Sequence, residues 1–175
     1  GTMIHGDDML SYSDSDLSSN SDITTKSQTG TMVFLNKVPV FWRSKKQCDT
    51  SRSIAEAEIY ALSHTVSNAR DVRFRLKDMD IHVTVPLAFK TDNKQAEVFS
   101  KSICVNSRLR GVFRLSEGWV QELRDRDQVA TSYVPAAKNA ANVLTKPIIA
   151  RGFRTERNMI SNFYKLQNVV NFAGD

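Results

Sequence analysis

Three acidic residues of this chain stand at positions where carboxylates could share metal ions. Asp14 ends an alternating stretch of residues 10–14, and Asp92 closely follows a second one at residues 83–89. Glu58 lies between them in a segment with helical spacing. If the two stretches are neighbouring strands and the helix packs across them, the three carboxylates come within reach of common divalent ions. Oxygen ligands without cysteine or histidine favour magnesium or manganese over zinc.

Each of these acids also has a plain structural explanation. Asp92 stands at a strand-to-helix turn, and aspartate is a favoured helix cap, so capping could account for it. Glu56 and Glu58 both lie off the centre of the apolar stripe of their helix, with Glu58 nearer to its buried edge. A solvated helix face accounts for either glutamate. The residues alone leave the structural and the chemical explanations open.

Alternation of apolar side chains with a period of two predicts the strands that would carry these acids. Asn36 and Lys37 separate two such runs and fit a hairpin turn. Residues 15–29 are rich in serine, aspartate, asparagine and threonine, which is typical of a solvated loop. The predicted strands cover residues 10–14, 31–35, 38–42, 83–89 and 129–135.

Helical spacing predicts the elements that would cover the sheet. A long helix follows several possible caps between Asp49 and Ser53, and its apolar stripe recurs at helical intervals. Asn93 can cap a second helix. Further helices are predicted at residues 112–126, 139–144 and, loosely, 153–172. The order of elements predicts an α/β fold with a mixed sheet and helices on its faces.

Composition limits the kind of protein that this chain can form. Its 175 residues, 41% of them hydrophobic, suffice for one domain with a tail. A net charge of +5 and a pI near 9.3 are compatible with a polyanionic partner. Two cysteines make neither a disulfide framework nor a zinc site, so we expect a reducing, intracellular setting. No stretch has the length and apolar character of a membrane span, so we expect no membrane partner.

Several sequence blocks, taken in order, carry a resemblance to a known family. The chain resembles the ribonuclease H domain at the end of the polyprotein of copia-type (Ty1-like) LTR retrotransposons. No single block is decisive, but their order and spacing are highly specific and cover nearly the whole chain. The blocks are YSDSD at 12–16, TGTMVFL at 29–35, VFWRSKKQ at 40–47, SIAEAEIYAL at 53–62, TDNKQA at 91–96, NSR at 106–108 and YVPAAKNAANVLTKP at 133–147.

The resemblance implies boundaries and a fold. Residues 1–9 would be a lead-in from the upstream reverse transcriptase connection, 10–147 the ribonuclease H-like domain, and 148–175 a C-terminal helical tail. The implied fold is an α/β ribonuclease H-like fold, a five-stranded mixed sheet with a central parallel pair and helices on its faces.

The resemblance also implies a two-metal active site of four carboxylates that hydrolyses the RNA strand of an RNA–DNA hybrid. Asp14 matches the first acid, Glu58 the helix glutamate and Asp92 the third acid. Glu58 is preferred to Glu56 because the family's glutamate directly precedes a pattern such as the one at residues 59–62. Two magnesium or manganese ions are implied, with no small-molecule cofactor. Three other acids match no ligand and are interpreted as solvated: Asp16, Asp22 and Glu97.

The fourth catalytic position is where this chain departs from the family. The family has Ala-Asp before its Leu-Thr-Lys-Pro sequence, whereas here Asn142 follows Ala141. An amide offers one neutral oxygen but lacks the charge that holds magnesium, so one of the two ions should be weakened. Two hypotheses follow: an active hybrid-specific endonuclease, or a catalytically degenerate ribonuclease H-like module retained for nucleic-acid or protein binding.

The implied partners are an RNA–DNA hybrid and the upstream reverse transcriptase domain of the same polyprotein. The implied location is intracellular, in a cytoplasmic virus-like particle or in the nucleus. Five cations are candidates for phosphate contacts, although a solvated surface charge explains each of them singly. They are Lys45, Lys46, Lys94, Arg108 and Arg110.

Overall fold

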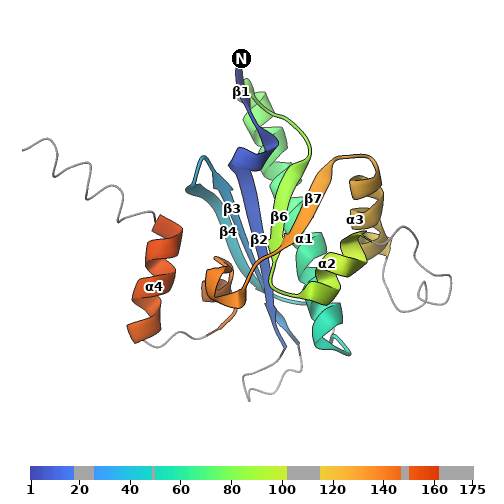
Figure 1. Cartoon of the computed structure of the whole chain (residues 1–175), viewed down its shortest axis with the longest axis vertical. Helices are drawn as coiled ribbons and strands as arrows, with labels where there is room; N and C mark the ends of the chain where they lie inside the picture. Colours follow the sequence, from blue (N-terminus) through green and yellow to red (C-terminus); the bar gives the residue numbers. More distant parts are fainter. Residues whose placement is uncertain (18–25, 49, 102–114, 147–149, 162–175) are drawn as a thin grey trace, which may run out of the picture.

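The computed structural model describes residues 1–17, 26–48, 50–101, 115–146 and 150–161 (Figure 1). Its centre is a five-stranded sheet with the strand order β4-β3-β2-β6-β7. The first three strands in that order are antiparallel neighbours, and β2, β6 and β7 run parallel. The predicted mixed five-stranded sheet with a central parallel pair is therefore confirmed. The strands are β2 (Met9–Asp16), β3 (Gln28–Leu35), β4 (Val38–Lys46), β6 (Leu87–Thr91) and β7 (Val129–Tyr133).

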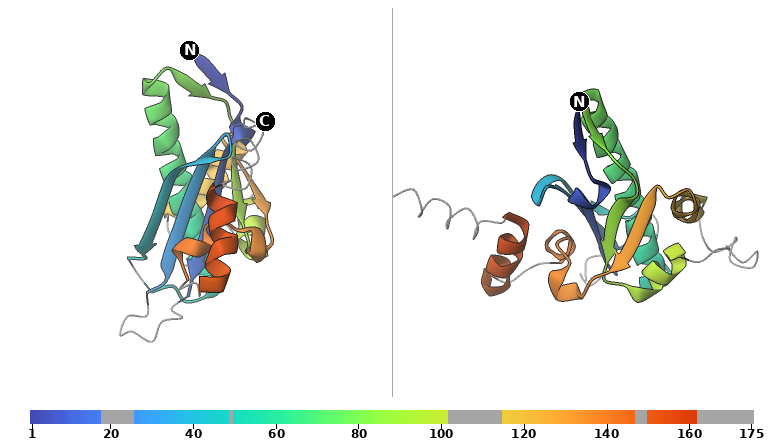
Figure 2. Two further views of the ribbon diagram at one scale, coloured as in Figure 1. Left: turned by 90° about the vertical axis from the view of Figure 1, so that its left-hand side faces the viewer. Right: turned by 45° about the horizontal axis from the view of Figure 1, so that its top comes forward.

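Three helices cover one face of this sheet (Figures 1 and 2). The long helix α1 (Ile54–Asp78) packs on β2 and β3, while α2 (Lys94–Lys101) and α3 (Leu115–Asp125) lie beside β7. The main apolar core lies between these helices and the sheet, and it includes Met9, Val33, Leu62, Val66, Phe89 and Val129. All but Met9, which was predicted to belong to the lead-in at residues 1–9, come from the apolar periods that predicted the elements. None of the described helices has the length and apolar character that a membrane span requires.

The other face of the sheet carries two 3-10 turns and one helix among the described residues. They are the 3-10 turns η2 (Ala136–Lys138) and η3 (Asn142–Leu144) and the helix α4 (Ala150–Ser161). A second apolar cluster of Met32, Phe34 and Ala140 joins this layer to the sheet. The helix predicted at residues 139–144 is thus a 3-10 turn of three residues, and the predicted segment beyond residue 161 lies outside the described residues.

The N-terminal residues form structure that the sequence did not predict. Strand β1 (Thr2–Ile4) pairs in parallel with β5 (Ile81–Val83), and η1 (Gly6–Asp8) leads into β2. The single strand predicted at residues 83–89 is divided between β5 and β6, which belong to different sheets. Pro86 lies at the division, and a proline has no N–H for a strand ladder, so the alternating pattern could not continue as one strand.

Candidate metal centre

Asp14 and Asp92 lie at the carboxyl end of the central parallel strands. Ser13 of β2 is the register partner of Thr91 of β6, so the two aspartates follow paired positions. Helix α1 packs across this end of the sheet and brings Glu58 to the same place. One carboxylate oxygen from each of the three acids lies within 4.8 Å of the other two. The structure therefore brings together the three acids that the sequence singled out.

The first turn of α1 explains why Glu58, and not Glu56, enters this group. Ser53 caps the helix by accepting a hydrogen bond from the Glu56 backbone N–H at 3.1 Å. The Glu56 carboxylate turns outward and accepts from the Arg52 backbone N–H at 2.6 Å, an arrangement close to a capping box. Glu58 instead points inward and is only 4% exposed.

Gln47 fixes the start of α1 against the sheet. Its side chain is buried, and its amide nitrogen donates to Thr29 Oγ1 on β3 at 3.1 Å and to the Ala57 carbonyl at 3.0 Å. Since Ala57 directly precedes Glu58, these two hydrogen bonds set the position of the glutamate relative to β3. The sequence analysis did not assign Gln47 a role. The only feature that sets it apart in the sequence is that it is an uncharged amide next to charged residues.

Capping does not account for Asp92. The side-chain oxygen of Asn93 accepts from the backbone N–H groups of Gln95 at 2.8 Å and Ala96 at 3.0 Å, which makes Asn93 the cap of α2. Asp92 Oδ1 is buried and has no hydrogen-bond partner. The predicted cap at Asn93 is thus present, so the adjacent Asp92 is not needed to cap α2.

The three acids fit a cation because each keeps a buried oxygen without a hydrogen bond. These oxygens are Asp14 Oδ1, Glu58 Oε2 and Asp92 Oδ1. An unpaired ionised carboxylate is expensive to bury, and a bound cation removes that penalty. Carboxylate oxygens are also the ligands that magnesium and manganese prefer. The site therefore has the donor set and the unsatisfied atoms of a divalent metal centre.

Glu58 and Asp14 keep their protons to higher pH than free carboxyl groups do. Burial, with the neighbouring charges of Asp14 and Asp92, raises the pKa of Glu58 to about 8. Burial also raises the pKa of Asp14 to about 6, although the hydrogen bond from Thr145 and the charge of Lys146 act in the opposite direction. Glu58 and Asp14 are thus held in a place that disfavours their charge unless a cation compensates it.

Asn142, which the resemblance matches to the family's fourth acid, belongs to η3. Its amide nitrogen donates to the Ala136 carbonyl, so the orientation of the amide is fixed. Its Oδ1 is buried and without a hydrogen-bond partner. The backbone carbonyl of Asn142 lies 3.1 Å from Thr145 Oγ1, and Thr145 in turn donates to Asp14 Oδ2. Asn142 is therefore connected to Asp14 through a single residue, Thr145.

Three further residues attach η3 to the centre, and sequence reasoning gave none of them a role. Asn139 is fully buried and donates through Nδ2 to the Ser13 carbonyl at 2.9 Å. Thr145 donates to Asp14 Oδ2, and Lys146 Nζ lies 3.8 Å from the same oxygen. In the sequence, Thr145 and Lys146 directly follow the helix predicted at residues 139–144, and nothing in their spacing indicates a contact with Asp14.

Gly30 allows η3 to approach the sheet this closely. It is the register partner of Asp14 on β3. A Cβ atom there would lie 2.8 Å from the Ala141 carbonyl oxygen and 2.8 Å from Thr145 Cγ2. The bare glycine backbone is therefore the surface on which the segment around Asn142 rests.

The described candidate phosphate contacts flank the acids on two sides. Lys45 on β4 pairs with Thr29, which pairs with Ser15 directly after Asp14. Lys45 and Lys46 are exposed, and Lys94 at the start of α2 lies over the Tyr133 ring, 5.4 Å from its centre. Arg108 and Arg110 lie outside the described residues, as does Asp22. Glu97 pairs with Lys101 at 2.6 Å and is not one of the acids that meet at the metal centre.

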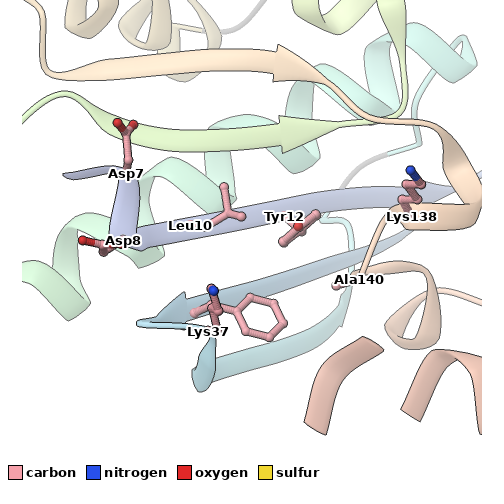
Figure 3. A pocket seen from close by; sticks show the side chains of 8 residues that line it. Asp7, Asp8, Leu10, Tyr12, Lys37, Lys138 and Ala140 are labelled. Atoms are coloured by element: carbon pink, nitrogen blue, oxygen red, sulfur yellow. The ribbon is translucent and has the colours of Figure 1, made fainter. Parts of the chain in front are cut away.

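A separate cavity of about 280 Å³ lies on the face of the sheet away from α1 (Figure 3). Tyr12, Phe34, Leu10 and Ala140 form its apolar part, and charged side chains from η1, the β3–β4 turn and η2 stand around it. Asp14, Glu58 and Asp92 do not line it. The cavity is therefore distinct from the metal centre.

Comparison with known proteins relates this arrangement to retrotransposons. No family model matches the chain. It is 27% identical over 143 residues to the Pol polyprotein of transposon RE1 from Arabidopsis thaliana, a match that covers 82% of this chain and 10% of the relative. It is 28% identical over 134 residues to a Ty1 Gag-Pol polyprotein of Saccharomyces cerevisiae, covering 74% of this chain and 7% of the relative. The chain thus spans about a tenth or less of these curated relatives.

Solved structures decide the fold. A ribonuclease H1 isolated from compost matches with a TM-score of 0.56 at 14% identity, covering 79% of this chain and 93% of that one. The N-terminal ribonuclease H domain of a Mycobacterium tuberculosis protein also gives 0.56 at 14% identity, covering 89% and 99%. The chain is a ribonuclease H-fold domain related to Ty1/copia-type Pol polyproteins. The compost enzyme has also been solved with an RNA/DNA hybrid, and that structure matches this ribonuclease H-fold domain with a TM-score of 0.55 at 12% identity, covering 83% and 99%.

Proposed function

We propose that this domain is the ribonuclease H of a retrotransposon polyprotein and cleaves the RNA strand of an RNA–DNA hybrid. The observation that carries the proposal is the group of buried, unpaired carboxylate oxygens of Asp14, Glu58 and Asp92 in a ribonuclease H fold. Relatedness to Pol polyproteins supports a polyprotein context. A fold neighbour that binds an RNA/DNA hybrid supports the substrate.

Asp14, Glu58 and Asp92 hold the cations, and the surrounding residues orient these ligands. Magnesium or manganese bound there supplies the Lewis acidity that activates water and stabilises the leaving 3′ oxygen of a phosphodiester. Gln47 positions Glu58 through the backbone of Ala57. The hydrogen bond from Thr145 holds Asp14 Oδ2 and leaves Oδ1 buried without a hydrogen-bond partner. The centre is therefore preorganised before a substrate arrives.

Lys45, Lys46 and Lys94 are the described residues suited to holding the hybrid backbone. They stand on both sides of the acids, two strands away on β4 and at the start of α2. Adjacent strands are about 4.8 Å apart, so Lys45 lies on the order of 10 Å from β2. Cations in this arrangement position a duplex through its phosphates, while 2′-hydroxyl contacts in the minor groove distinguish RNA from DNA.

One observation favours a second candidate function. Asn142 provides a neutral amide where the family has its fourth acid, which reduces the charge available to a second ion. On this alternative, the domain is a catalytically degenerate ribonuclease H-like module that still binds hybrid or a protein partner. The basic surface and the fold are common to both candidates, so binding alone does not separate them.

Cleavage of a labelled RNA–DNA hybrid, in magnesium and then in manganese, tests the proposal. The wild-type domain should cut, and Asp92→Asn should reduce the rate by at least about a hundredfold, because it removes an anionic ligand. Glu97→Gln is the matched control, since that carboxylate pairs with Lys101 and is not one of the three acids of the centre, and it should cut like the wild type.

Two other outcomes would change the conclusion. Cleavage retained by a folded Asp92→Asn variant would show that the centre lies elsewhere. No cleavage in either metal, with hybrid binding retained, would support the degenerate module instead.

A further inference from the structure

The two oxygens of the Asp14 carboxylate have different surroundings. Oδ1 is buried without a hydrogen-bond partner, as are oxygens of Glu58 and Asp92. Oδ2 receives the hydrogen bond from Thr145 and has the Lys146 ammonium 3.8 Å away. Oδ1 is thus available to an added cation, whereas Oδ2 already has the ammonium group of Lys146 nearby.

Lys146 stands on the side of Asp14 where Asn142 lies. Its backbone N–H donates to the Asn142 carbonyl at 3.2 Å, so both residues belong to one tight turn. Thr145 connects the same turn to Asp14, and Asn139 anchors it to the Ser13 carbonyl. The position of the lysine is therefore set by a segment with several buried attachments, although its side chain is 46% exposed.

The charges of this centre match one divalent ion better than two. When a cation keeps them ionised, Asp14, Glu58 and Asp92 provide three negative charges, and Asn142 provides none. One divalent cation together with one ammonium group balances three carboxylates. A second divalent ion would have to bind beside Lys146 without the fourth carboxylate, where like charges repel.

We propose that the centre binds a single divalent ion at Asp14 Oδ1, Glu58 and Asp92, and that Lys146 supplies the second positive charge on the Asn142 side. This inference rests on the proposed metal centre and corrects its expected content from two ions to one. The chain thus has an amide at residue 142 where the family has a carboxylate, while Lys146 belongs to the Leu-Thr-Lys-Pro sequence that it shares with the family.

Counting the ions tests this inference without any substrate. Manganese titrated into metal-free wild-type protein, followed by calorimetry and by the electron paramagnetic resonance signal of free manganese, should give one ion per chain. The double variant Asn142→Asp/Lys146→Gln should bind two ions, because it restores the carboxylate and removes the competing charge. Lys146→Arg keeps the charge and should bind one ion.

Lys146→Gln alone should still bind one ion, about three- to fivefold more tightly, because a repelling charge has been removed near the site. Lys138→Gln removes a cation from η2, outside the centre, and should leave both the count and the affinity unchanged. Circular dichroism of each variant shows whether it is folded.

Two ions bound by the wild type with similar affinity would overturn the inference, and this result does not depend on the folding of any variant. One ion bound by a folded double variant would also overturn it. Because the count needs no hybrid, it is independent of cleavage: a wild type that binds one ion but never cuts leaves the inference standing and removes the proposed function.

Discussion

The hydroxyl of Thr145 donates a hydrogen bond to the carboxylate of Asp14, which lies 131 positions earlier in the chain. Both residues are buried, with exposed fractions of 7% for Thr145 and 1% for Asp14. The contact joins η3 to the central strand β2 at the point where the acids meet. Thr145 therefore links the orientation of the first acid to a segment near the end of the described chain.

Replacing Thr145 by valine removes the hydroxyl while keeping the shape of the side chain. We expect the free energy of unfolding to fall by about 1–3 kcal/mol, because a buried carboxylate oxygen loses its donor. We also expect weaker manganese binding, because Asp14 is no longer held in one orientation. Urea unfolding and calorimetric titration measure the two effects. Thr145→Ser keeps the hydroxyl and should restore the affinity; if it does not, the methyl group matters rather than the hydrogen bond.

Asn142→Asp tests the departure from the family pattern. The added carboxylate should raise hybrid cleavage in magnesium by about tenfold or more, since it supplies the missing negative charge. The same change removes the amide donor to the Ala136 carbonyl, so the metal-free variant should lose about 1 kcal/mol of stability. Cleavage rates and urea unfolding check both parts. Unchanged cleavage by a folded variant would mean that the fourth ligand comes from another residue.

Stability without metal should decrease as the pH rises. The raised pKa values of Glu58 and Asp14, about 8 and about 6, mean that the folded chain keeps protons that the unfolded chain releases above its ordinary values of 4.5 and 3.8. The free energy of unfolding therefore falls between about pH 4 and pH 8, by at most about 1.4 kcal/mol per pH unit for each group.

Urea unfolding with a chelator at pH 5, 7 and 8 measures this dependence. Saturating magnesium should flatten it, because the cation takes the place of the bound protons. A metal-free domain that becomes more stable toward pH 8 would show that Glu58 and Asp14 are charged in the folded protein.

Gly30→Ala should loosen the segment around Asn142. The new methyl group would meet the Ala141 carbonyl oxygen and Thr145 Cγ2, both at 2.8 Å, and a backbone atom cannot move aside cheaply. We expect a loss of about 1–3 kcal/mol, as for other overpacked sites, together with weaker metal binding. Chemical unfolding and metal titration of the variant check this. Wild-type values in both would show that η3 does not need close contact with β3.

The sequence predicted the parts of the fold that follow from regular spacing. The strands of the central sheet and the stripe of α1 were identified because their apolar residues repeat with the period of the element. Pro86 interrupts a strand inside an alternating pattern, and the β1–β5 pair has only three residues in each strand, too short to give a pattern. Short parallel pairs of this kind depend on tertiary contacts that local spacing does not encode.

For the candidate site, the sequence predicted the three acids but not the residues that orient them. The three acids could be found because carboxylates at strand ends and on an adjacent helix suggest a shared cation. Gln47, Asn139 and Thr145 could not, because a buried amide or hydroxyl has the same sequence signature as an exposed one. Their importance comes from specific partners that are distant in the chain, such as Asn139 with Ser13, 126 positions apart.

The attachment of η3 across Gly30 also determines when the centre is complete. Once Asp14, Glu58 and Asp92 have been synthesised, the growing chain contains every carboxylate of the centre. Asp14 still lacks its contacts with Thr145 and Lys146, which come later in the chain. The segment that fixes the first acid is therefore made last among the residues of the centre. A nascent chain that ends before Thr145 has the three acids but not the segment that orients Asp14. The centre is therefore assembled only after nearly the whole domain has emerged.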